Sequence, residues 1–157
     1  MFPKTNLPLN IFETRYIEMI DYALSNNRLL GMVQHKENKA LYNIGCYGKI
    51  TVFNETPDKK YLINLEGLSC FKIIREIKSS KKYRMCEVAT IDNFNNNDLQ
   101  EELKPKILYS FKKYNQIKNI NLSLDQVSQL SLLDLLKLIV MISPFDVSVK
   151  QMLLELK

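Results

Sequence analysis

The sequence is poor in cysteine and histidine, the residues that staple small folds or bind metals. Its 157 residues include three cysteines, Cys46, Cys70 and Cys86, and none belongs to a C-x-x-C pair. An odd number of isolated cysteines is typical of reduced thiols, so we expect a cytoplasmic protein without disulfides. His35 is the only histidine. Because a metal centre needs several converging ligands, we expect no metal and no cofactor.

Glycine is also scarce, and the glycine-rich motifs of enzymes are missing. The four glycines stand at positions 31, 45, 48 and 67. They form no G-x-x-x-x-G-K-S/T phosphate loop, no G-x-G-x-x-G fingerprint and no G-x-S-x-G nucleophile elbow. The sequence therefore predicts a protein that is not an enzyme.

No hydrophobic run is long enough to cross a membrane. The most apolar stretch, residues 130–142, is short and contains Ser131, Asp134 and Lys137, so it predicts a buried helix. The first residues show no basic segment followed by an apolar one, and we expect no signal peptide and no membrane partner.

The remaining composition is that of a globular protein. Hydrophobic residues make up 46% of the chain and charged residues 25%, and 22 Lys and Arg against 17 Asp and Glu give a net charge of +5. A chain of this size can bury a core without disulfides. The mild positive charge permits an anionic partner but does not require one.

Two regions of different character meet at the asparagine-rich tract 93–98. Before it, turn residues separate short β-prone runs; after it, Leu and Ile recur at helical spacing. We therefore expect an α+β architecture with a β lobe over residues 1–94 and a helical lobe over residues 98–157.

The β lobe is predicted to hold one helix and several short strands. The helix is expected over residues 15–24, where Tyr16, Ile20, Ala23 and Leu24 share one face. Gly67 is expected to end a strand. The strands are predicted at residues 29–34, 42–53, 61–66, 71–77 and 83–91, and their short connections favour an antiparallel sheet that curls into a small barrel.

The helical lobe is predicted from an apolar stripe and from capping residues. Leu99, Leu103, Ile107, Phe111 and Tyr114 form the stripe, and Pro105 marks either a kink or the first turn of its helix. The capping signals are Ser123 and Ser131 at two helix starts, Ser143-Pro144 at a helix end, and Asp146 or Ser148 before a last helix over residues 149–156.

One basic run allows two interpretations. Residues 72–84 contain Lys72, Arg75, Lys78, Lys81, Lys82 and Arg84 against the single acid Glu76. Such a run could contact the phosphates of a nucleic acid. It could equally be the solvent face of a hairpin, where charge keeps an edge strand soluble. The second interpretation is favoured, because Lys and Asn are frequent along the whole chain.

The opening of the sequence resembles a known family. Residues 2–16, FPKTNLPLNIFETRY, are similar to the first signature of the Lon protease N-terminal, substrate-binding domain. The resemblance continues through RLLGMV at 28–33, LYNIGC at 41–46 and YLINLEGLSCF at 61–71. MISPF at 141–145 and KQMLLE at 150–155 resemble the helical half of short members that lack the ATPase and peptidase domains.

This resemblance implies a PUA-like β-barrel lobe followed by a small helical bundle. In full-length Lon proteases the domain engages unfolded substrates, whereas other domains hydrolyse ATP and peptide bonds. We accordingly expect a non-catalytic protein that binds apolar polypeptide segments or a protein partner in protein quality control. The alternatives are an RNA-binding PUA-like module that uses the basic run, and a remnant or accessory of an ATP-dependent peptidase.

The residues of the resemblance are expected to have mainly structural roles. Three partly apolar positions, Met32, Tyr47 and Phe53, are candidates for contacting a bound polypeptide. The pair Glu13 and Arg15 could join to each other or to backbone groups. The signature positions expected to shape the fold are Pro8, Leu9, Ile11, Phe12, Glu13, Arg15, Tyr16, Gly31, Gly45 and Gly67.

The sequence departs from the family at both ends. Family members usually have another strand before the point where Phe2 stands, and they tend to continue with another helix after residue 155. Without the first strand the sheet is expected to expose an edge, and an exposed edge could pair two copies of the chain into a homodimer.

Overall fold

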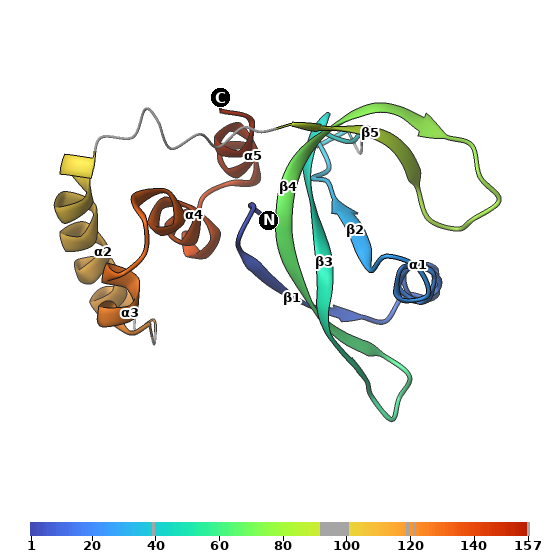
Figure 1. Ribbon diagram of the computed structural model, residues 1–157, viewed down its shortest axis with the longest axis horizontal. Helices are drawn as coiled ribbons and strands as arrows, with labels where there is room; N and C mark the ends of the chain where they lie inside the picture. The colour runs from blue at the N-terminus through green and yellow to red at the C-terminus, as the bar shows by residue number, and fades with distance from the viewer. Residues whose placement is uncertain (39, 92–100, 119, 121, 157) are drawn as a thin grey trace.

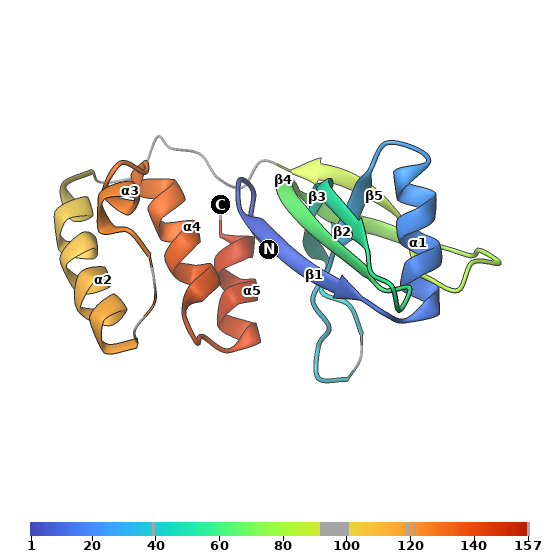
Figure 2. The same cartoon turned by 90° about the horizontal axis from the view of Figure 1, so that it is seen from below.

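An antiparallel sheet with one helix is followed by a group of helices (Figures 1 and 2). The computed structural model describes residues 1–38, 40–91, 101–118, 120 and 122–156, so the predicted boundary at 93–98 and Leu99 lie outside the described residues. The strands are β1 (Asn6–Ile11), β2 (Leu29–Met32), β3 (Ile44–Glu55), β4 (Tyr61–Ile77) and β5 (Met85–Ile91). The helices are α1 (Thr14–Leu24), α2 (Lys104–Lys118), α3 (Leu124–Ser128), α4 (Leu132–Ile142) and α5 (Val147–Glu155), with a 3₁₀ turn at Glu101–Leu103. The predicted α+β class is confirmed.

The long strand β4 organises the sheet. The strand order is β1-β4-β3-β2, and β5 also pairs with β4. β1 pairs with the first part of β4, from Tyr61 to Glu66, and β5 pairs with the second part, from Cys70 to Ile77. Figure 1 shows β4 curving between these two parts. The pairings of the described strands join all five in one sheet, and its closure into a PUA-like barrel stays a prediction.

The predicted strand break at Gly67 is wrong. β4 runs through this residue as one strand of 17 residues. The Gly67 N–H donates to the Thr5 carbonyl and the Gly67 carbonyl accepts from the Lys4 N–H, each at 2.8 Å. A Cβ at this position would collide with the Phe2 carbonyl oxygen. Gly67 therefore allows the start of the chain to approach β4 closely. The other predicted strands differ from the observed ones by two residues at one or both ends.

The first core lies between α1 and the sheet. Ile20 and Ala23 of α1 are buried against Leu30, Ile50 and Leu65 of three strands. Ile20, Ala23 and Leu24 of the predicted apolar face thus pack on this core, whereas Tyr16 is not part of it.

Local capping signals set the ends of the C-terminal helices. The Ser131 Oγ accepts a hydrogen bond from the Asp134 N–H at 3.1 Å, and the Ser123 Oγ accepts one from the Gln126 N–H at 3.5 Å. Pro105 is the second residue of α2, in the first turn, where its missing N–H has no helical partner to lose. Asp146 precedes α5, but its side chain makes no capping hydrogen bond.

Two further cores involve the C-terminal helices: one lies among the helices, and the other lies between the helices and the sheet. Phe111 of α2, Val127 of α3 and Leu135 of α4 are buried together. Leu154 of α5 packs with Phe2 and Cys70. Figure 2 shows α4 and α5 on the side of the helical group that faces the sheet. No helix within the described ranges is long and apolar enough to span a bilayer.

Candidate functional site

The three residues predicted to contact a polypeptide do not form an exposed surface. Met32 and Phe53 are half-buried and pack against the core under α1. The ring of Tyr47 is also half-buried, with its centroid 6.4 Å from that of Phe71. The Phe53 ring meets the Tyr61 ring edge-on at 4.9 Å. These contacts explain the three side chains as packing groups, and their binding role stays a prediction.

The signature residues of β1 alternate across the sheet. Leu9 and Ile11 point toward α1 and pack on the first core, whereas Pro8 is exposed. Phe12, which was expected to shape the fold, does not pack in a core, because 65% of its surface is exposed. It follows the last residue of β1 and precedes α1, at the point where the chain leaves the sheet.

Glu13 and Arg15 pair with each other, as one of the two open alternatives predicts. The Arg15 Nε lies 2.9 Å from the Glu13 Oε2, and the guanidinium carbon lies 4.5 Å from the centroid of the Tyr16 ring. Both charged side chains are about half exposed, so the pair is a surface feature that contributes at most about 1 kcal/mol to stability.

Two of the signature glycines make room for one ring. Phe71 is buried, and a Cβ on Gly45 would lie 2.7 Å from its Cζ atom and 2.5 Å from the Met32 carbonyl oxygen. A Cβ on Gly31 would lie 3.2 Å from the same Cζ atom. Both positions thus fit the predicted structural role.

Carboxylates neutralise half of the cations in the basic run. Arg75 pairs with Glu87 at 2.6 Å and Arg84 pairs with Glu76 at 2.9 Å, both across the β4–β5 hairpin. Lys81 reaches Glu18 of α1 at 3.5 Å. Lys72 and Lys82 are exposed. The partners on other elements were not visible from the run itself, and they favour the interpretation of a solvent-exposed hairpin.

Two cysteines face each other in the sheet without forming a disulfide. Cys46 of β3 is paired with Cys70 of β4, and both are buried free thiols. The contact with the Cys46 thiol raises the pKa of Cys70, and burial raises it further because it disfavours the thiolate. Among the residues that the structure describes, no three His, Cys, Asp or Glu side chains converge as metal ligands.

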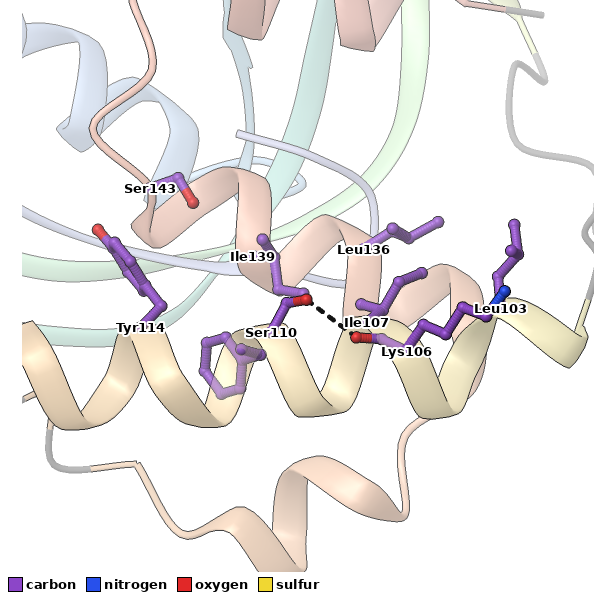
Figure 3. A pocket seen from close by; sticks show the side chains of 9 residues that line it. Leu103, Lys106, Ile107, Ser110, Tyr114, Leu136, Ile139 and Ser143 are labelled. Atoms are coloured by element: carbon purple, nitrogen blue, oxygen red, sulfur yellow. Dashed lines mark hydrogen bonds between the residues drawn. The ribbon is translucent and has the colours of Figure 1, made fainter.

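A groove lies between α2 and α4 in the helical lobe (Figure 3). Its volume is about 430 Å³. Ile107 and Tyr114 of α2 and Leu136 and Ile139 of α4 line its two sides, and Figure 3 shows the α4 side chains facing α2. The complete lining is Leu103, Lys106, Ile107, Ser110, Phe111, Tyr114, Leu136, Ile139 and Ser143.

The apolar stripe along this groove was predictable from the sequence, but the groove itself was not. Leu103, Ile107, Phe111 and Tyr114 were assigned to one apolar face, which is correct. Of these four, only Phe111 is fully buried; Ile107 and Tyr114 are half-buried and Leu103 is exposed. Periodicity identifies a face that avoids water, but it does not tell whether the neighbouring helix covers that face completely.

Comparisons with solved structures identify the fold. The crystal structure of a Lon N-terminal domain protein from Xanthomonas campestris matches with a TM-score of 0.73 and 16% identity, over 99% of this chain and 83% of that chain. The N-terminal domain of the Mycobacterium avium complex Lon protease matches with a TM-score of 0.77 and 17% identity, over 98% of this chain and 83% of that chain. At such identities the likeness concerns the fold alone.

Comparisons of sequence identify the family. The Lon protease of Syntrophus aciditrophicus (strain SB) is 26% identical over 102 residues, which are 58% of this chain and 13% of that protein. The family model of the ATP-dependent protease La (LON) substrate-binding domain matches residues 1–157. The chain therefore belongs to the LON substrate-binding domain family.

Proposed function

We propose that this chain is a non-catalytic module that binds exposed apolar segments of polypeptides, as an unfolded protein or a protein partner in protein quality control presents them. The observation that carries the proposal is the family match over residues 1–157. It is supported by the groove between α2 and α4, whose walls are mainly apolar. The 157 residues contain no phosphate-loop motif and no nucleophile elbow, and the free thiols suit the reducing cytoplasm.

The size of the groove sets the expected affinity. A volume of about 430 Å³ admits two or three apolar side chains. Burial of one Leu or Phe side chain contributes roughly 1.5–3 kcal/mol. Ordering of the peptide and loss of its free motion offset much of this gain. We therefore expect dissociation constants of roughly 10–100 μM, as a module that samples many unfolded chains requires.

Binding of an unfolded protein tests the proposal. Reduced, carboxymethylated α-lactalbumin with a fluorescent label serves as the probe, and native α-lactalbumin is the control. We expect fluorescence anisotropy to rise with the unfolded probe only. Absence of any rise up to several hundred micromolar, with circular dichroism showing that the chain is folded, would reject the proposal.

The other activities give different readings in parallel assays. An RNA-binding module would shift an RNA oligonucleotide in a gel, with an affinity that falls steeply with salt and depends on Lys72 and Lys82. A peptidase accessory would change casein cleavage by a Lon protease in the presence of ATP. Pairing through a sheet edge would give a dimer in analytical ultracentrifugation. The ion pairs of the hairpin argue against the RNA reading, because they reduce the charge available to phosphates.

A further inference from the structure

Helix α2 is strongly basic. α2 carries five lysines, Lys104, Lys106, Lys112, Lys113 and Lys118, and no acidic residue. The whole chain has 22 basic and 17 acidic residues, so the five lysines of α2 equal its entire net charge of +5.

These lysines are not neutralised within the part of the chain that the structure describes. No ion pair joins any of them to a carboxylate there, in contrast to the basic run of the hairpin. Glu101 and Glu102 lie in the turn before α2, at the N-terminal end of the helix, where they favour the helix dipole. The centre and the C-terminal end of α2 therefore stay basic.

The basic residues border the apolar groove. Lys106 lines the groove directly, beside Ser110 of the next turn (Figure 3). Lys113 is seven residues after Lys106 and so lies on the same side of the helix. Its ammonium group stands 4.5 Å from the centroid of the Tyr109 ring, which is 62% exposed. Lys106 thus stands at the edge of the apolar groove, and Lys113 lies just outside its lining on the same side of α2.

We propose that the α2–α4 groove binds apolar polypeptide segments flanked by acidic residues. This inference rests on the proposed function and adds the location and the charge preference of the binding site. Side chains such as Leu, Ile or Phe fill the space between Ile107 and Leu136, while flanking Asp or Glu residues meet Lys106 at the edge of the groove and Lys113 just outside it. A nucleic acid would meet the lysines but would not use the aliphatic walls. The apolar lining therefore favours a polypeptide as the occupant.

Three labelled peptides test the charge preference. They share one apolar core and differ in their flanks, which are acidic, neutral or basic. Each exposed ion pair contributes about 0.2–1 kcal/mol, so two pairs are expected to give the acidic peptide roughly two- to thirtyfold tighter binding than the neutral one, and the basic peptide is expected to bind more weakly than both. The preference is expected to shrink as salt increases. Equal affinities for the acidic and basic peptides would overturn the inference.

Two sets of variants locate the site. Ser110→Trp places a large ring in the groove without emptying the core and is expected to weaken all three peptides about tenfold; Ser110→Ala is the matched control and is expected to bind normally. Lys106→Glu with Lys113→Glu is expected to reverse the preference, whereas Lys72→Glu with Lys82→Glu on the hairpin is expected to leave it unchanged. All four side chains are exposed, so folding is expected to persist.

The outcomes separate this inference from the proposed function. If unfolded α-lactalbumin binds and Ser110→Trp does not weaken it, the groove is not the site, while the proposed function stands. If no polypeptide binds at all, both fail. If an RNA oligonucleotide displaces the peptides and its binding depends on the lysines but not on Ser110→Trp, α2 is a nucleic-acid surface and the inference is wrong.

Discussion

The ring of Phe71 is held by backbone on two neighbouring strands. Gly45 is its direct partner on β3, and Gly31 lies on β2, so the ring occupies the space that two Cβ atoms would need. Neither glycine has a positive φ angle. Both positions therefore require glycine because a side chain would not fit, and the space is tighter at Gly45 than at Gly31.

We predict that Gly45→Ala destabilises the protein more than Gly31→Ala does. The new Cβ of Gly45→Ala would meet the fixed Met32 carbonyl oxygen at 2.5 Å, whereas that of Gly31→Ala would meet only ring atoms, at 3.2 Å or more. Overpacking costs about 1–3 kcal/mol, and we expect Gly45→Ala at the upper end. Urea denaturation measures both changes. Equal costs for the two variants would contradict the prediction.

Substitutions of Phe12 and of its neighbour Ile11 are expected to change stability by very different amounts. Phe12 is mostly exposed, so Phe12→Ala is expected to change the free energy of unfolding by less than about 0.5 kcal/mol. Ile11 packs on the first core, so Ile11→Ala is expected to cost about 1–3 kcal/mol, less than a fully buried site. Thermal denaturation followed by circular dichroism compares them. A large cost for Phe12→Ala would mean that its ring supports the fold.

Among the elements, those governed by local signals were predictable from the sequence. The start of α4 follows from Ser131, and the first turn of α2 is one of the two positions that the sequence allows for Pro105, because both signals depend on neighbouring residues only. The continuity of β4 through Gly67 was not predictable, because the hydrogen-bond partners of this residue, Lys4 and Thr5, come from far away in the sequence. The groove was missed for the same reason: it depends on how closely α4 approaches α2.

Ser131 is expected to stabilise α4 measurably. Its Oγ accepts from the Asp134 N–H at 3.1 Å and donates to the Asp134 Oδ2 at 2.8 Å, so one side chain satisfies two groups. Ser131→Ala is expected to cost about 1 kcal/mol of stability. Ser123→Ala serves as the control and is expected to cost less, because its capping hydrogen bond is 3.5 Å long. Chemical denaturation measures both costs, and a larger cost for Ser123→Ala than for Ser131→Ala would refute the prediction.

At the scale of the whole molecule, α5 couples the helices to the sheet. Leu154 is buried against Phe2 and Cys70, and the Gln151 Nε2 donates to the Ile44 carbonyl oxygen of β3 at 2.9 Å. The two lobes, predicted as separate regions of one domain, therefore share buried contacts. Their separation at residues 94 and 98 stays a prediction.

We predict that Leu154→Ala weakens both lobes together. The expected cost is about 2–4 kcal/mol, because the side chain is buried in the shared core. Hydrogen exchange measured by mass spectrometry is expected to show faster exchange in β3 and β4 as well as in α4 and α5. Met152→Ala, at an exposed position of the same helix, is the control. Faster exchange in the helices alone would show that the lobes unfold independently.

Lys137 is expected to make the free energy of unfolding change with pH in the alkaline range. It is 4% exposed, and burial lowers its pKa below the ordinary 10.5, although Asp134 at 3.8 Å opposes the shift. Between the lowered pKa and 10.5 the unfolded chain binds a proton that the folded chain has lost, so this lysine makes stability rise with pH. Relative to the parent chain, Lys137→Met is thus expected to be more stable near neutral pH.

The comparison across pH provides the control for Lys137→Met. The free energy of unfolding of both chains is measured at neutral pH and near pH 10.5. In the difference between the two chains, the contributions of the other titrating groups cancel, because the chains share these groups. The advantage of the variant is expected to shrink toward pH 10.5. A constant or growing difference would show that burial does not control the ionisation of Lys137.

The contact between α5 and β3 has a consequence for biosynthesis. Gln151 and Ile44 are 107 residues apart, so β3 leaves the ribosome long before the helix that covers its first residue is made. Such non-local contacts slow folding, because a large loop must close before they form. The nascent sheet therefore carries an uncovered apolar surface around Cys70 until α5 is made, and a chain halted before α5 would itself display the kind of exposed segment that quality control removes.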